Sequence, residues 1–322
     1  MKSKLLAFVA RLNASRKENE LLFWARVATI VAVIILFIVK RSFWTPDTLF
    51  IVLLAMFVVL GQARNFLLRF APFVLLLLTY DSFRSIADDL NKNVHFWEMI
   101  DFDRWMFGGQ LPTATLQQWW WHGTLQWYDF YFYFLYTIHF VVPLVLAIVL
   151  WKVREHLYWP FVVALVGLSF GAFITYVIFP AAPPWMASDL HFIEPIHRIS
   201  SDIWRAMGIE DPQGLYAKLS PNAVAAVPSL HSAYPLLFWL FIVKAFGFRR
   251  MGWLFVYPLS MWVGVTYMGE HYVFDAILGA IYAIAAYAAT MWFFAWARGR
   301  DWQFRADYHR GFAWGHAKTR RR

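Results

Sequence analysis

The chain from Val227 to Gly279 reads VPSLHSAYPLLFWLFIVKAFGFRRMGWLFVYPLSMWVGVTYMGEHYVFDAILG. Two apolar runs within it are separated by a basic turn at residues 244–250. A helix needs about 20 residues to cross a membrane, so a chain that reverses at this turn returns to the surface from which it started. His231 and His271 are therefore expected at the same membrane surface.

The second histidine is followed by a carboxylate one helical turn later. His271 and Asp275 are four residues apart, a spacing that stacks two side chains on one side of a helix. The carboxylate can then hold one ring nitrogen while the other nitrogen faces a substrate. With His231 free to act as an acid, the pattern indicates an oriented nucleophile or base and a separate proton donor.

These residues resemble the type 2 phosphatidic acid phosphatase superfamily and, within it, the branch of inositol phosphorylceramide synthases. The motif P-S-x-H stands at residues 228–231 and the motif H-x-x-x-D at residues 271–275. The stretch PAAPPW at residues 180–185 looks like the inositol phosphotransferase branch, and the likeness spans residues 80–279. The superfamily usually carries an arginine six residues before the second histidine, where this chain has Val265.

The resemblance implies a mechanism. His271 is the nucleophile that forms a phosphohistidine, Asp275 fixes its tautomer, and His231 protonates the departing alcohol. Such a reaction is ping-pong and uses neither a metal nor another cofactor. The implied function is the transfer of a phosphorylated headgroup, of the inositol phosphate type, from a membrane phospholipid donor to a lipid alcohol acceptor such as ceramide.

Other readings of the same residues stay open. With water as acceptor, the histidines would serve a lipid phosphate phosphatase acting on phosphatidic acid or a polyprenyl diphosphate. A proton-coupled transporter would use them as proton carriers. Two histidines and a carboxylate also ligate iron, but membrane iron oxygenases carry many more clustered histidines. The missing basic motif residues favour the transferase, because a phosphodiester carries less charge than a phosphomonoester.

Composition agrees with a membrane enzyme. Hydrophobic residues make up 61% of the chain and charged residues 15%, a balance typical of several membrane spans. The absence of cysteine excludes disulfides, thiolate metal sites and a cysteine nucleophile. The net charge of +9 lies mostly beside apolar runs, so we expect no nucleic acid partner.

The apolar runs predict an all-α fold, a polytopic helical membrane bundle of about eight transmembrane helices around a six-helix catalytic core. Most of the 29 Lys and Arg residues fall in segments on one side of this arrangement. The positive-inside rule then predicts cytoplasmic N- and C-termini in the plasma or inner membrane, with the active site on the outer face. The expected spans are residues 22–39, 48–61, 66–80, 127–151, 159–179, 227–243, 253–268 and 272–296.

This pattern divides the chain into three parts. Residues 1–64 are predicted as an amphipathic helix with two accessory transmembrane helices, because basic residues alternate with apolar ones near the start. Residues 65–297 form the catalytic membrane core. Residues 298–322 form a basic cytoplasmic tail that would contact anionic lipids.

Phosphate binding needs positive charge, and Arg84 is the first candidate. It lies in YDSFR at residues 80–84, which resembles the Tyr-Asp-x-x-Arg of this branch, with Asp81 beside it. A headgroup anchor or an ion pair with Asp81 is the alternative role for this arginine. Lys218 and Arg198, in the outer loop 180–226, are further candidates, and that loop is either a lid or a solvated connector.

Two other residues complete the candidate set. Ser229 could donate to a phosphate oxygen, although a serine at a helix start is more often a cap. His139 could contact a lipid headgroup or join two helices by a hydrogen bond. Glu270, beside His271, is expected to point away from it and is assigned no role.

Overall fold

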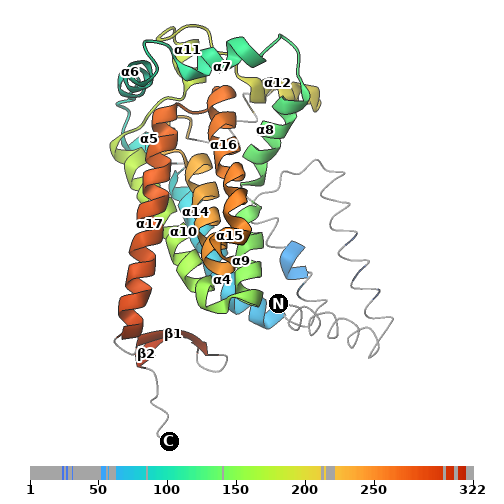
Figure 1. The fold of residues 1–322 in the computed structure, drawn as a ribbon, viewed down its shortest axis with the longest axis vertical. Helices are drawn as coiled ribbons and strands as arrows, with labels where there is room; N and C mark the ends of the chain where they lie inside the picture. Colours follow the sequence, from blue (N-terminus) through green and yellow to red (C-terminus); the bar gives the residue numbers. More distant parts are fainter. Residues whose placement is uncertain are drawn as a thin grey trace, which may run out of the picture. The chain divides into compact units, whose positions relative to one another are not determined.

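The computed structural model describes residues 24, 27, 31, 52–55, 57, 63–84, 86–139, 141–211, 214, 222–299, 302–307 and 311–316. Regular structure in these residues is helical, apart from the antiparallel strands β1 (Trp302–Asp307) and β2 (Gly311–His316) (Figure 1). The amphipathic helix predicted near the N-terminus and the candidate Lys218 lie outside the described residues.

Contacts between residues divide the chain into two units, which are described separately. Unit 1 comprises residues 1–78, 144–162 and 290–322, and unit 2 comprises residues 79–143 and 163–289. Three helices contribute residues to both units: α4 (Ala63–Arg84), α10 (Tyr158–Ile178) and α17 (Val273–Gly299). Both histidines belong to unit 2. The predicted division at residues 64 and 297 stays a prediction.

Unit 1 is held together by aromatic packing and one buried cation. Phe66 stacks on Phe57 and on Phe70, each at 4.6 Å between ring centroids. Arg69 is buried, and its guanidinium donates to Glu155 in η1 (Glu155–Leu157) at 2.6 Å. Its carbonyl accepts a hydrogen bond from Tyr158 at 2.8 Å. These contacts fix the start of α4 against η1 and the start of α10.

The prediction of eight membrane spans is not confirmed. Within the described part of the chain, three helices are long and apolar enough to cross a membrane: Asn65–Arg84, Glu155–Ile178 and Val273–Arg298. A fourth span results if Trp127–Ile138 and Val142–Val153 make one broken span. The chain is thus a helical integral membrane protein, and the predicted spans 22–39 and 48–61 lie largely outside the described residues.

Two of the predicted spans are short helices. Helix α14 (Leu230–Phe246) has 17 residues, and α16 (Val256–Tyr267) has 12. At 1.5 Å per residue, α16 covers only about 18 Å of the roughly 30 Å hydrocarbon core. The basic turn forms the short helix α15 (Phe248–Met251), and the second apolar run starts in η2 (Gly252–Phe255) before α16 begins at Val256.

The reversal between α14 and α16 follows the sequence prediction. Helix α14 ends at Gly247, whose φ of +93° is a conformation that favours glycine. Helix α16 then returns and packs against α14 and against α8 (Trp127–Ile138). A Cβ at Gly264 would meet the ring of Phe132 at 2.7 Å, so α8 and α16 are in close contact there.

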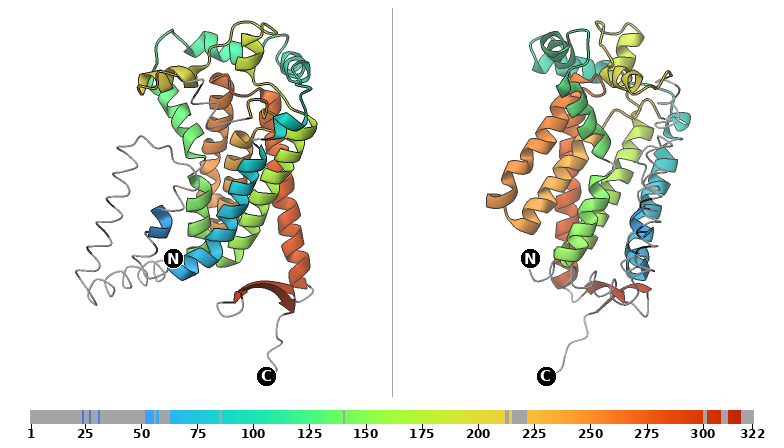
Figure 2. Two further views of the ribbon diagram at one scale, coloured as in Figure 1. Left: turned by 180° about the vertical axis from the view of Figure 1, so that it is seen from behind. Right: turned by 90° about the vertical axis from the view of Figure 1, so that its right-hand side faces the viewer.

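Short helices gather at the end of unit 2 where α16 stops and α17 begins (Figure 1), and the other views agree (Figure 2). They are α6 (Trp97–Met106), α7 (Pro112–Trp120), α11 (Pro184–Asp189) and α12 (Ile199–Ala206). Proline opens α7 and α11 at a position where its missing N–H costs no helical hydrogen bond. Apolar side chains of these segments bury Tyr267, Met268 and Tyr272.

Three separate segments meet beside these helices. Parallel bridges join His95 to Ala181 and Ala181 to Ala225. The N–H of Ala181 donates to the Val224 carbonyl at 2.8 Å, and the N–H of Ala226 donates back to Ala181 at 3.3 Å. The PAAPPW stretch therefore lies directly beside the segment that leads into His231.

Candidate active site

His231 stands at the start of α14, and its neighbours explain why the helix begins there. The Ser229 side chain accepts a hydrogen bond from the Ser232 N–H at 3.2 Å and so caps the helix. The Ser229 N–H donates to the Asp275 carbonyl at 3.1 Å. Ser229, a sequence-based candidate for a hydrogen bond to phosphate, is thus a fully buried cap that also fixes α14 to α17.

His271 reaches Asp275 by a different local geometry from the one predicted. Helix α17 begins at Val273, so His271 lies in the turn before it rather than on the same helix. The ring still approaches the carboxylate, with 3.2 Å between Nδ1 and Asp275 Oδ2. The same oxygen accepts the Tyr272 N–H at 2.9 Å, as the third residue of a helix does in a capping box.

The two histidines face each other. Nε2 of His271 lies 3.4 Å from Nδ1 of His231. Because a carboxylate only accepts hydrogen bonds, Asp275 places the proton of a neutral His271 on Nδ1 and leaves a lone pair on Nε2. The unprotonated nitrogen of one ring is therefore directed at the other histidine. This is the arrangement that a nucleophile and an acid require.

Aromatic rings surround His231. Its ring stacks on Tyr136 at 4.0 Å between centroids and meets the ring of His139 edge-on at 4.3 Å. Nε2 of His231 is buried and has no hydrogen-bond partner among the described residues. The structure thus brings His139 against His231, where it restricts the His231 ring.

Arg84 provides positive charge near these rings. It is the last residue of α4 and is half-buried. Its guanidinium is close enough for a coulombic interaction with His139 and His231, and also with Tyr176 and Tyr234. Its carbonyl accepts a hydrogen bond from the buried Asn222 side chain at 3.1 Å. Asp81, one turn earlier, is exposed.

Asp103, which belongs to neither sequence motif, holds the start of α17. Its two oxygens accept the N–H groups of Val273 and Phe274 at 3.0 and 2.9 Å, groups that have no partner within the helix. Burial raises the pKa of this carboxyl to about 7, although the two hydrogen bonds lower it. Together with Asp275, it fixes the turn that carries His271.

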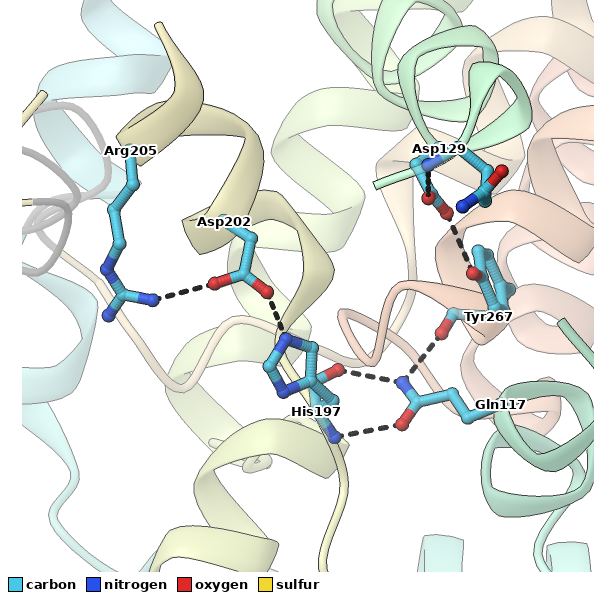
Figure 3. A network of polar contacts seen from close by, with 7 residues as sticks. Gln117, Asp129, His197, Asp202, Arg205 and Tyr267 are labelled. Carbon is cyan, nitrogen blue, oxygen red and sulfur yellow. Dashed lines mark hydrogen bonds and ion pairs between the residues drawn. The ribbon is translucent and has the colours of Figure 1, made fainter. Parts of the chain in front are cut away.

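A glutamine fixes the other side of that turn. Gln117, in α7, donates to the carbonyls of His197 and Tyr267 at 2.7 and 2.8 Å and accepts the His197 N–H at 2.8 Å (Figure 3). The hydroxyl of Tyr267 donates to the buried Asp129 at 2.7 Å. The end of α16 is therefore held by both its backbone and its side chain.

The family model of the PAP2 superfamily matches residues 97–289. The chain belongs to the PAP2 superfamily. This is the type 2 phosphatidic acid phosphatase superfamily that the motifs at residues 228–231 and 271–275 predict, and the prediction is confirmed.

Two curated relatives are similar to this PAP2 protein. The phosphoinositol dihydroceramide synthase of Bacteroides thetaiotaomicron is 28% identical over 146 residues, 43% of this chain and 47% of the relative. The inositol phosphorylceramide synthase of Candida albicans is 27% identical over 164 residues, 48% of this chain and 34% of the relative. The chain thus spans less than half the length of these relatives. No solved structure matches it.

The superfamily's usual arginine position is occupied here by a structural residue. Val265 is fully buried, and its carbonyl accepts the N–H groups of Glu270 and His271 at 3.0 and 3.1 Å. Arg198, a further candidate for phosphate binding, is paired with Glu270 at 3.0 Å. Of the candidate cations named from the sequence and described here, Arg84 is the one whose charge reaches the histidine rings.

Sequence reasoning assigned no role to Asp103, Gln117 or Glu270. The sequence did contain a hint for Glu270, because a carboxylate near a membrane is costly to bury and is therefore usually paired or functional. Asp103 and Gln117 had none. Each acts on residues at least 80 positions away in the chain, and no local pattern predicts that.

Proposed function

We propose that this PAP2 protein is a membrane phosphotransferase that moves a headgroup phosphate, of the inositol phosphate type, from a glycerophospholipid to a lipid hydroxyl such as that of ceramide. The observation that supports this best is the line from Asp275 through His271 to His231, with its 3.2 and 3.4 Å contacts. The names of both relatives support a phosphoinositol headgroup and a ceramide-type acceptor.

In the first half-reaction His271 Nε2 attacks the phosphorus of the donor lipid. A phosphorus–nitrogen bond forms, the bond from phosphorus to the diacylglycerol oxygen breaks, and His231 gives its proton to that oxygen. Asp275 keeps the Nδ1 proton in place and stabilises the positive charge that develops on the ring. Diacylglycerol leaves, and the headgroup phosphate stays on His271.

In the second half-reaction the acceptor lipid restores the enzyme. Its hydroxyl oxygen attacks phosphorus, its proton passes to the now neutral His231, and the bond to His271 breaks. Water in the place of the lipid hydroxyl would release the free headgroup phosphate. The choice between the two acceptors separates a transferase from a phosphatase.

Donor binding must separate the two rings. A nucleophile stands about 3–3.5 Å from the atom that it attacks, and the leaving oxygen must fit between phosphorus and His231. The present 3.4 Å between the two nitrogens leaves no room for this group. We therefore propose that the rings, in contact without substrate, part when the phosphate enters.

Two groups are proposed to bind the phosphate. Arg84 would neutralise its charge, supported by its coulombic interaction with both His139 and His231. Ser232 would donate a hydrogen bond, because its buried hydroxyl has no partner among the described residues. Asp81, His139 and Lys218 are kept as candidates for headgroup contact. The active site is proposed to open to the outer membrane face.

The test is a label-transfer assay on purified protein. Phosphatidylinositol labelled with phosphorus-32 is supplied with ceramide, and labelled phosphatidic acid is supplied in a parallel reaction. We expect label in a new lipid that depends on ceramide and is abolished by His271→Ala. Release of free phosphate from phosphatidic acid without any labelled new lipid would make the protein a phosphatase instead.

A further inference from the structure

The loop and helices at residues 184–200 cover the turn that carries His271. The N–H of Trp185 donates to the Gly269 carbonyl at 3.1 Å. Gly269 has a φ of +79°, and a Cβ there would meet Ile196 at 3.0 Å and the His197 carbonyl at 3.3 Å. The backbone of the catalytic turn thus lies directly against this outer segment, without a layer of side chains between them.

The residue before His271 joins this segment by a buried ion pair. Glu270 is 5% exposed, and its two oxygens accept from Arg198 Nε at 3.0 Å and Nη2 at 3.2 Å. The Ser200 hydroxyl donates to the same carboxylate. The Arg198 guanidinium also lies over the Trp185 ring, 4.1 Å from its centroid. A two-point contact between an arginine and a carboxylate fixes direction as well as distance.

The pair differs from the other ion pairs of the same segment. Arg205 pairs with Asp202 at 2.7 Å and Arg104 pairs with Glu194 at 3.1 Å, but all four side chains are at least 21% exposed. The side chains of Arg198 and Glu270 are 12% and 4% exposed. Exposed pairs contribute little, whereas loss of one partner of a buried pair leaves a charge uncompensated. Glu270 and Arg198 therefore hold this segment on the catalytic turn.

We propose that the Glu270–Arg198 pair determines the acceptor, by keeping water from the phosphohistidine while a lipid hydroxyl reacts. This inference rests on the proposed transferase function. Both acceptors break the same bond to His271 Nε2 and give their proton to His231, so the chemistry itself does not select between them. A closed cover over a reactive intermediate prevents its hydrolysis. Glu270 and Arg198 are thus positioning residues that act through residues 184–200.

The experiment measures how the label divides between two products. Wild-type protein and variants receive labelled phosphatidylinositol and ceramide, and the new lipid and the water-soluble headgroup phosphate are counted separately. Glu270→Gln keeps the size of the side chain and removes its charge. Arg198→Lys keeps the charge and removes the two-point contact of the guanidinium. We expect transfer to fall about 100-fold in each, as for a misplaced reacting group, while hydrolysis falls less.

A matched control and a double variant sharpen the result. Arg205→Gln removes an exposed pair in α12, just after this segment, and should leave the transfer-to-hydrolysis ratio unchanged. Glu270→Gln combined with Arg198→Lys loses less than the product of the two single losses, because both act through one contact. Thermal unfolding identifies any variant that does not fold, and Ser200→Ala, which removes one neutral donor, then provides the test with a smaller shift in the same direction.

The outcomes separate this inference from the function on which it rests. Variants in which both products fall equally, with the ratio kept, would show that the pair only stabilises the fold, and the inference would be overturned. Wild-type protein that forms no labelled lipid would overturn the proposed transferase, and this inference with it. A ratio that shifts toward free headgroup phosphate in Glu270→Gln and not in Arg205→Gln supports it.

Discussion

At the scale of single residues, the site depends on which atom of each side chain faces which neighbour. One oxygen of Asp275 accepts hydrogen bonds from Nδ1 of His271 and from the backbone N–H of Tyr272. The other nitrogen of His271 is left toward His231. In the proposed reaction this arrangement makes His271 the nucleophile and His231 the acid.

The first prediction concerns the acid. His231→Asn should slow the first half-reaction by about 10²–10⁴-fold with a lipid donor, because the diacylglycerol oxygen then leaves without a proton. A donor with a nitrophenyl leaving group needs no proton and should lose much less. Rapid-quench measurement of product release with both donors checks this. Equal losses with the two donors would remove His231 from the acid role.

The second prediction concerns Asp103. Its pKa of about 7 in the folded protein lies above the ordinary value of 3.8, so between these pH values the folded form keeps a proton that the unfolded chain has lost. Its contribution to stability is thus complete below pH 4 and is lost as the pH rises to 7. The whole effect is on the order of 4 kcal/mol.

Thermal unfolding of wild-type protein and Asp103→Asn, followed from pH 4 to 8, measures this. The melting temperature of the wild type should fall relative to that of the variant between pH 4 and 7, with no further change above. No relative change over the same range would mean that the N–H groups of Val273 and Phe274 hold the carboxyl ionised.

At the scale of elements, the site is an assembly of helix ends. Helix α14 begins at Leu230, next to His231. Helix α16 ends at Tyr267, four residues before His271, and α17 begins at Val273, two residues after it. Packing between α14 and α17 sets the distance between the histidines. The two helices approach closely at Gly279, where a Cβ would lie 2.4 Å from the Ser229 carbonyl oxygen.

Gly279→Ala should therefore separate α17 from α14. Overpacking of this kind costs about 1–3 kcal/mol, and a small displacement of His271 from His231 should also reduce turnover. Thermal unfolding and the transfer assay report the two effects. Gly167→Ala in α10 is the control, because nothing lies within 4 Å of a Cβ there. Equal behaviour of the two variants would show that the contact at Gly279 does not set the helix spacing.

At the scale of the whole molecule, the sequence predicted the family, the helical class and the three motif residues. Each of these leaves a local signal: an apolar run, a proline at a turn, or a histidine and a carboxylate at fixed spacing. The count of eight spans was not confirmed. Apolar composition does not fix the length of a helix, so α14 and α16 are shorter than the predicted spans require, and the predicted spans 22–39 and 48–61 lie largely outside the described residues. The Glu270–Arg198 pair joins residues 72 positions apart, and only the folded chain brings them together.

The proposed orientation gives a prediction at this scale. The chain has no cysteine, so single cysteines can report which side of the membrane a segment faces. Leu190→Cys, in the exposed part of the outer segment, should react with an impermeant maleimide added outside sealed cells. Arg249→Cys, in the basic turn, should react only after the membrane is opened. The reverse pattern would place the active site on the inner face.

The most direct test of the proposed mechanism is to trap the covalent intermediate on His271. Protein mixed with labelled phosphatidylinositol and no acceptor is quenched in base, where a phosphorus–nitrogen bond survives, and its peptides are analysed by mass spectrometry. We expect inositol phosphate on His271. This label should be lost in acid and absent from His271→Ala, and Asp275→Asn should form it more slowly. Turnover of the donor without label on His271, or with label on His231 instead, would contradict it.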